Sequence, residues 1–134
     1  MNKRVVFHLA MLAAFAITGC GKVQPVKGRV VYTDGSPATE LAGHYIMFQS
    51  GEHKVGATGV IRADGTFTVG THTDTDGAML GKQRVAISPP AREITKPVPK
   101  KVILDRYASF ETSNLEIDIT SGTNTPTITV EKLN

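Results

Sequence analysis

The residues best suited to chemistry stand close together in one polar stretch near the middle of the chain. His72, Asp74 and Asp76 alternate there ahead of Gly77, which partly matches the calcium-loop pattern D-x-[DN]-x-[DN]-G-x₅-E. In that register His72 replaces an Asp and Gln83 replaces the bidentate Glu, so the two most charged ligands are missing. The pattern favours turn-forming aspartates in a solvated loop. A weak Ca²⁺ site on Asp74, Asp76 and His72 is the alternative.

Other catalytic arrangements are not indicated. His44, His53 and His72 stand on different predicted elements, with neither HxH nor HExxH spacing for a transition metal. No G-x-S-x-G sequence marks a nucleophile, and the acidic residues are spread over turns without forming an obvious glycosidase pair. We therefore expect no enzyme, no catalytic residue and no cofactor.

The first twenty residues have the pattern of a secretory leader. Lys3-Arg4 precedes an apolar stretch, residues 5–17, that is shorter than the roughly 20 residues a membrane-spanning helix needs. The stretch ends in Ile17-Thr18-Gly19-Cys20, which resembles the bacterial lipobox. The resemblance implies diacylglycerol on the Cys20 sulfur, cleavage after Gly19 and acylation of the new amino terminus, which together give stable anchoring. The alternative is a secreted protein with an incidental Cys20.

This leader implies how the chain is organised and where the protein resides. We expect a signal peptide with a signal helix over residues 1–19, a lipidated tether over residues 20–25 and a folded domain over residues 26–133. The protein is then anchored to membrane lipid in the cell envelope and faces the periplasm or the cell surface. Gly21 follows the cysteine where Asp would favour inner-membrane retention, and this favours the outer membrane.

Composition and charge are typical of a single globular domain. The chain has 134 residues, 40% hydrophobic and 20% charged, a balance typical of globular proteins. Its formal charge of +3 falls to +1 when Lys3 and Arg4 are removed with the leader. A domain so nearly neutral is not expected to bind nucleic acid.

Apolar residues after the leader alternate with polar ones. Val26, Val30 and Tyr32 share one face of the first predicted strand, and Gly28 on that face allows a close neighbour. Strands are predicted at residues 26–32, 44–49, 55–61, 66–69, 83–88, 115–120 and 128–130. About seven short strands between Gly, Pro and Asp turns, without an amphipathic helix, predict an all-β, antiparallel β-sandwich.

Turn residues suggest how these strands connect. Asp64-Gly65 predicts a hairpin between residues 55–61 and 66–69. The turn at residues 121–124 predicts a second, terminal hairpin. Residues 102–110 form either one helical turn or an irregular segment with Tyr107 tucked against the sandwich.

A proline-rich stretch, residues 89–101, contains four prolines and cannot be an interior strand. We expect it to be a long exposed crossing. Its lysines, Lys96, Lys100 and Lys101, either keep the crossing solvated or bind anionic lipid head groups near the anchor.

The order of several short motifs, taken with the lipobox, resembles the carboxypeptidase regulatory-like (transthyretin-like) domains of small bacterial lipoproteins. The resemblance spans residues 23–133 and rests on Val26-x-Gly28-x-Val30, Gly35-x-Pro37, Asp64-Gly65-Thr66-Phe67-Thr68, Asp76-Gly77-Ala78, Gly81-Lys82, the strand at residues 85–87 and Tyr107. It implies a prealbumin-like sandwich of seven strands without catalytic residues. Residues 38–43 and Leu104 depart from the family pattern.

These features predict a structural or protein-interaction module with an envelope protein as partner, because exposed sheet edges can accept another strand. The alternative is a periplasmic small-ligand or carbohydrate-binding domain. The absence of Trp and the separation of Tyr32, Tyr45 and Tyr107 along the chain disfavour sugar binding.

Overall fold

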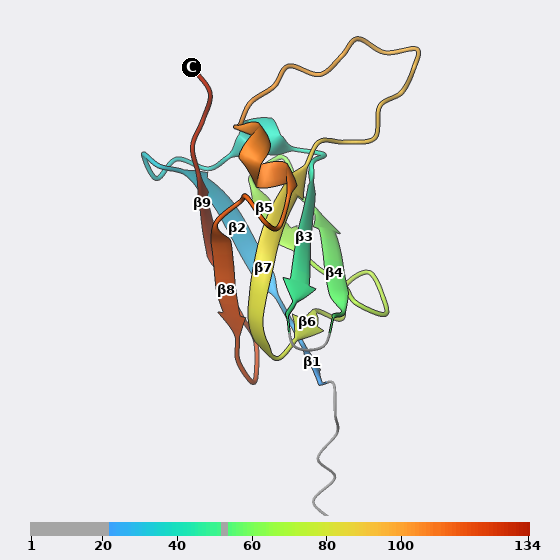
Figure 1. Cartoon of the computed structure of the whole chain (residues 1–134), viewed down its shortest axis with the longest axis vertical. Coiled ribbons are helices and arrows are strands. Elements are labelled where there is room, and N and C mark those ends of the chain that lie inside the picture. The colour runs from blue at the N-terminus through green and yellow to red at the C-terminus, as the bar shows by residue number, and fades with distance from the viewer. Residues whose placement is uncertain (1–21, 52–53) are drawn as a thin grey trace, which may run out of the picture.

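The computed structural model describes residues 22–51 and 54–134 and shows a mostly β fold (Figure 1). In chain order the elements are β1 (Val23–Gln24), β2 (Lys27–Tyr32), the 3₁₀ turn η1 (Thr39–Leu41), β3 (Tyr45–Ser50), β4 (Gly56–Val60), β5 (Thr66–Thr68), β6 (Ala78–Met79), β7 (Gly81–Ser88), the 3₁₀ turn η2 (Asp105–Ala108), β8 (Leu115–Ile119) and β9 (Thr127–Val130). No helix in this described part reaches seven residues, and none is long and apolar enough to cross a membrane. The predicted signal helix and Cys20 lie outside the described residues.

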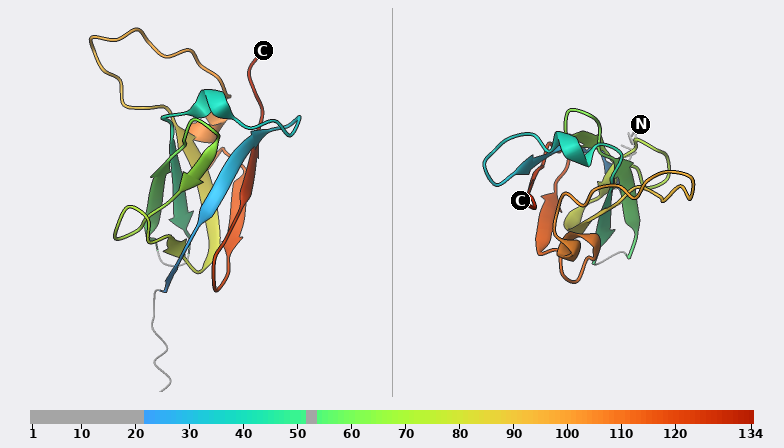
Figure 2. Two further views of the ribbon diagram at one scale, coloured as in Figure 1. Left: turned by 180° about the vertical axis from the view of Figure 1, so that it is seen from behind. Right: turned by 90° about the horizontal axis from the view of Figure 1, so that it is seen from above.

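Seven of the described strands form two larger sheets. One sheet has the order β5-β2-β9 and the other the order β4-β3-β7-β8, while β1 and β6 pair separately. In Figure 1 the four-stranded sheet lies in front of β2, and Figure 2 brings β2 to the front. Buried side chains from both sheets form one core between them.

The predicted alternation is largely confirmed. Val26, Val30 and Tyr32 are buried, and so are Phe67 and Val69. The two faces of β3 are covered to different degrees. Ile46 and Phe48 are buried, but Tyr45 on the opposite face is 37% exposed.

Phe67 joins the two sheets at the centre of the core. It lies directly across from Gly28 in the β2–β5 pair, and a Cβ added to Gly28 would come within 2.4 Å of the Phe67 ring. The Phe67 ring packs edge-on against Phe48 of the other sheet, with centroids 6.0 Å apart. The predicted close neighbour of Gly28 is therefore an aromatic ring from the next strand, which fills the space of the missing side chain.

The predicted terminal hairpin is wrong. β8 pairs with β7 in the four-stranded sheet, whereas β9 crosses to the other sheet and pairs with β2. The β2–β9 pair is parallel, so the expectation of purely antiparallel sheets is also wrong for this pair. Period-two alternation shows which face of a strand is apolar. Because both sheets pack on the same core, that face is buried in either sheet, so alternation does not predict which strand lies next to it.

The predicted hairpin around Asp64-Gly65 forms only at its turn. Arg62 N–H donates to the Thr66 carbonyl at 2.8 Å, but β4 and β5 then continue in different sheets. They meet again through a bridge between Thr58 and Gly70. The turn residues predict the reversal correctly, while the separation of the two sheets prevents a full ladder.

Two short strands lie where the sequence suggested a tether and a loop. Val23 and Gln24, in the expected tether, pair with Met79 and Ala78 in the expected loop. The Gln24 side chain also accepts a hydrogen bond from Gly122 N–H at 2.8 Å. β1 is therefore tied into this end of the domain, three residues after Cys20 in the sequence.

The segment before β8 contains a helical turn, the first of the two predicted alternatives. Tyr107 of η2 is buried, and its hydroxyl accepts a hydrogen bond from Glu131 N–H at 3.0 Å. The proline-rich crossing before it loops out from the end opposite β1 (Figures 1 and 2). This position separates its lysines from the start of the domain, so lipid binding near the anchor is not supported.

Phe67 generates the first prediction. Phe67→Ala should lower the free energy of unfolding by about 3–5 kcal/mol, because it removes a fully buried ring that touches both sheets. Chemical denaturation measures the loss. Val60→Ala is the matched control and should stay within about 0.5 kcal/mol, since Val60 is 48% exposed. Equal losses in the two variants would contradict the assignment of Phe67 as the central contact.

Candidate functional site

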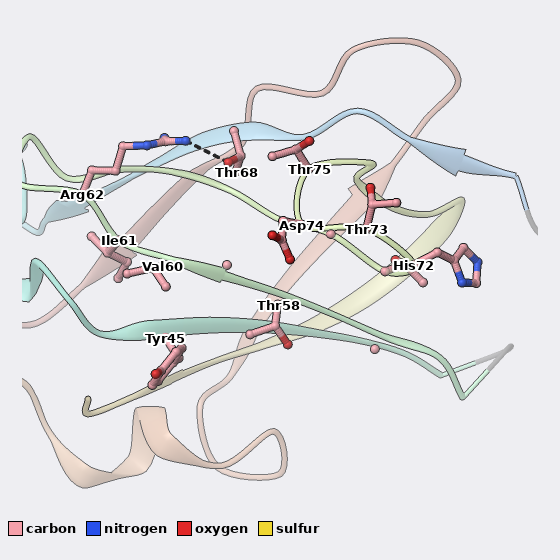
Figure 3. Close-up of a pocket in the computed structure, with 14 residues that line it drawn as sticks. Tyr45, Thr58, Val60, Ile61, Arg62, Thr68, His72, Thr73, Asp74 and Thr75 are labelled. Atoms are coloured by element: carbon pink, nitrogen blue, oxygen red, sulfur yellow. Dashed lines mark hydrogen bonds between the residues drawn. The ribbon is translucent and has the colours of Figure 1, made fainter. Parts of the chain in front are cut away.

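A groove of about 790 Å³ runs along β4 between Tyr45 on one side and the loop at residues 71–75 on the other. Figure 3 shows its labelled side chains, with Asp74 directed toward Thr58 and Arg62 at one end beside Thr68. Its lining combines threonine hydroxyls, backbone of three glycines, one carboxylate and one guanidinium. Such a surface offers many hydrogen-bonding groups around a small apolar contact.

Close backbone contacts shape the floor of the groove. A Cβ on Gly59 would come within 1.9 Å of the Thr68 carbonyl oxygen, so β5 can approach β4 here only because residue 59 is glycine. Beside it, Thr58 and Gly70 exchange two backbone hydrogen bonds of 3.0 Å. These bonds satisfy the backbone N–H and carbonyl of Thr58 that point away from β3, at the middle of β4.

Between the Thr58–Gly70 bonds and the Arg62–Thr66 bond, the backbone groups of Val60 make no backbone hydrogen bond on the outer side of β4 among the described residues. Backbone groups alternate in direction along a strand, so those of Val60 point away from β3, as those of Thr58 do. Val60 is 48% exposed and stands directly across from Tyr45, which is 37% exposed. The two side chains form an apolar patch beside outward-facing backbone groups.

Asp76 builds the loop that forms the opposite wall. Its carboxylate accepts hydrogen bonds from Thr71 N–H at 2.6 Å and from His72 N–H at 3.0 Å. Burial would raise the pKa of Asp76, but bonds from the backbone N–H groups of Thr71, His72 and Thr73 outweigh it and hold the pKa below its ordinary value. Asp76 therefore serves the structure of the loop.

The Arg62 end of the groove is fixed by neighbouring hydroxyls. One guanidinium nitrogen donates to Thr68 Oγ1 at 2.8 Å and another to Thr66 Oγ1 at 3.4 Å. Thr66 in turn donates to Asp64, whose pKa is lowered first by this side-chain bond and then by the backbone bond from Thr66. Arg62 thus presents a positioned positive charge at the groove's end.

The structure does not bring the three calcium-loop candidates together. Asp76 is engaged by backbone N–H groups, Asp74 faces the groove, and His72 extends away from Asp74 in Figure 3. Gln83, at the Glu position of the pattern, is buried and donates to the Met79 carbonyl at 2.9 Å. Within residues 22–51 and 54–134, no three His, Cys, Asp or Glu side chains gather as a metal site.

The remaining candidates are also dispersed. His44 lies at the other end of β3 from the Gly56 end of the groove, and His53 and Cys20 fall outside the described residues. In the described part, no groove threonine hydroxyl bonds to His72: Thr68 Oγ1 is bonded by Arg62 and Thr71 Oγ1 donates to the Gly77 carbonyl. This arrangement can bind polar groups but shows no activated nucleophile.

Sequence reasoning missed Tyr45, Val60 and the threonine-lined wall. The Thr-x-Thr-x-Thr spacing at residues 71–75 was visible, but only the fold places these threonines opposite β4. Tyr45 and Val60 read as ordinary strand residues, and their pairing depends on register.

No family model, no curated protein and no solved structure matches this chain.

The loop generates the second prediction. Asp76→Asn should lower the melting temperature by several degrees at pH 7, because it removes the charge that accepts the backbone bonds. A lowered pKa in the folded state stabilises the fold above the ordinary value of 3.8 and loses that effect as the pH falls below it. The difference from the unaltered protein should therefore shrink toward pH 3.

Asp74→Asn is the matched control in the same loop. The Asp74 carboxylate makes no hydrogen bond within the described residues, so its removal should leave the melting temperature at pH 7 unchanged. An Asp74→Asn loss as large as that of Asp76→Asn would contradict the role assigned to Asp76.

Proposed function

We propose that the chain is a lipid-anchored, non-catalytic module of the cell envelope whose β4 groove receives an extended segment of a partner protein. The observation that carries the interaction part is the groove itself. It offers the Tyr45–Val60 apolar patch, outward backbone groups at Val60 and a row of threonine hydroxyls in one channel. Extended peptides are recognised by this combination of backbone bonds and side-chain contacts.

The position of the first strand supports the anchored part. β1 begins at Val23, three residues after Cys20, so acyl chains on that cysteine would hold the β1 end of the domain against the membrane. The proline-rich crossing would then project away from the membrane (Figure 1). Gly21 makes the outer membrane the preferred location in this proposal.

The sheet arrangement supports the proposed fold type. A three-stranded and a four-stranded sheet around one core agree with the seven-stranded, prealbumin-like sandwich that the resemblance implies. The β1–β6 pair and the parallel β2–β9 pair are features of this chain beyond that expectation. A fold of this type is compatible with many functions, so the groove carries the functional argument.

Small-ligand binding is the second candidate function. A separate apolar cavity with a basic rim, at the base of the proline-rich crossing, favours it. Carbohydrate binding through the β4 groove has less support, because among the described residues that line it Tyr45 is the only Phe, Tyr or Trp.

The anchor is tested by metabolic labelling. Full-length protein should incorporate labelled palmitate, and Cys20→Ser should abolish the labelling. Equal labelling of the two proteins would contradict acylation at Cys20.

The groove is tested by site-specific crosslinking in the native envelope. A photoreactive residue at position 60 should give one recurrent protein adduct, while the same residue at position 116 on β8 should not. Tyr45→Ser should reduce the adduct at least threefold, roughly the effect expected from losing one partly buried aromatic contact. Asp118→Ser, on the opposite edge of the same sheet, is the matched control and should leave it unchanged.

A strong adduct at position 116 with none at position 60 would place the partner on β8 and contradict the groove. Adducts of equal yield at both positions would indicate non-selective contact and would also contradict it.

A further inference from the structure

A second cavity, of about 290 Å³, lies at the end of the domain opposite β1. It is lined by the base of the proline-rich crossing, the end of β7 and η2, and it opens to solvent on the side of the crossing. None of its lining residues belongs to the β4 groove, so the two sites are separate. Its volume is about twice the ~150 Å³ of an engineered cavity that holds one benzene, which gives room for about ten to twelve carbon atoms.

The interior of the cavity is apolar. Its walls include Ile87 from β7, Val102, Leu104, Ala108 and the prolines at the base of the crossing. Val98 stands at this site and is 69% exposed, and Ile94 farther along the crossing is 96% exposed. Large aliphatic side chains this exposed gain free energy when an apolar partner covers them.

The rim of the cavity is basic. Arg92, Lys100 and Lys101 line it, and Asp105 is the one acidic residue in the lining. Lys101 is paired with Asp105, so that pair is locally neutral. Arg92 and Lys100 make no ion pair among residues 22–51 and 54–134.

Glu40 does not compensate for these charges. It lies close enough for Lys100 to lower its pKa slightly, but hydrogen bonding by Lys132 is the first cause of that lowering. Lys132 Nζ lies 2.9 Å from the Glu40 carboxylate. Lys132 is therefore the main partner of Glu40, and the charge of Lys100 is less compensated than the charge of Lys132.

The charge of the domain is concentrated at this end. Residues 89–101 carry four basic residues and one acidic residue, a net charge of +3. The remaining part of residues 20–134 carries nine basic and eleven acidic residues, a net charge of −2. Lys96 pairs with Glu93 and Lys101 with Asp105, so Arg92 and Lys100 carry the positive charge that attracts an anion to this end of the molecule.

A buried polar atom of His44 calls for a hydrogen-bonding group on the ligand. His44 lines the cavity, and its Nδ1 is buried without a hydrogen-bond partner. Burial lowers the pKa of His44, against a smaller opposing effect of the Leu41 and Ala42 backbone, and this favours the neutral ring. A neutral imidazole can donate to or accept from a polar ligand group.

We propose that this cavity binds an amphiphilic carboxylate, a single alkyl chain of about ten carbons whose carboxylate lies at Arg92 and Lys100. The chain packs against Ile87, Val102 and Leu104, and the head group gives His44 a polar neighbour. The ligand is a free monomeric acid, since the cavity is too small for the two chains of a membrane phospholipid.

Calorimetric titration of the mature chain, residues 20–134 with Cys20→Ser, tests the proposal without detergent. Decanoate, added below its micelle concentration, should bind saturably at one site. Decylammonium has the same alkyl length and the opposite charge, and it should not bind. Equal binding of the two amphiphiles, or no saturable binding of decanoate, would overturn the proposal.

Variants test the location of the site. The double substitution Arg92→Gln and Lys100→Gln should weaken decanoate binding about tenfold, because two charge-assisted contacts are lost. Lys22→Gln with Lys27→Gln removes the same charge at the β1 end and should leave the affinity unchanged. Ala108→Leu, which fills the cavity, should abolish binding while the melting temperature stays near that of the parent protein. Decanoate binding that survives both the charge and the filling variants would overturn the proposal.

Vesicles distinguish a free acid from a membrane lipid. The Cys20→Ser protein should not sediment with phosphatidylglycerol vesicles. Sedimentation that the Arg92 and Lys100 substitutions abolish, together with no decanoate binding, would show that the crossing binds membranes and would overturn the proposal. Because these readouts do not involve Val60 or a protein partner, their failure leaves the proposed groove function untouched.

Discussion

The contact between Phe67 and its two neighbours, Gly28 and Phe48, sets the spacing of the whole domain. Phe67 fills the space left by Gly28 within its own sheet and reaches Phe48 in the other. With few aromatic residues in the chain, this pair supplies much of the large buried surface between the sheets. The same spacing brings β5 onto Gly59, and that approach forms the floor of the β4 groove.

The two ends of the domain differ in bonding and in charge. At one end β1, β6 and the turn containing Gly122 are tied by short backbone and side-chain bonds, directly behind the position of Cys20. At the other end the chain leaves β7 through a basic, proline-rich crossing over an apolar cavity. An anchor at the first end would leave the second end free to meet solutes, which is consistent with the cavity proposed there.

Much of this architecture could be predicted from local pattern. Alternation placed Val30, Phe67 and Ile128 in the core, and the glycine at position 28 indicated a close neighbour. Local pattern could not predict that β9 leaves β8 and pairs in parallel with β2, because an apolar strand face is satisfied by either sheet. It also could not reveal the groove, since Tyr45, Val60 and Thr73 become neighbours only through register and the return of the loop.

Interstrand nuclear Overhauser effects test the central packing most directly. The account predicts contacts between the rings of Phe48 and Phe67, and backbone contacts between Val30 and Ile128 in the parallel pattern. Contacts of Ile117 with Ile128 in an antiparallel ladder, with none between Val30 and Ile128, would show a terminal hairpin instead. That result would contradict the two-sheet arrangement on which the groove and the cavity depend.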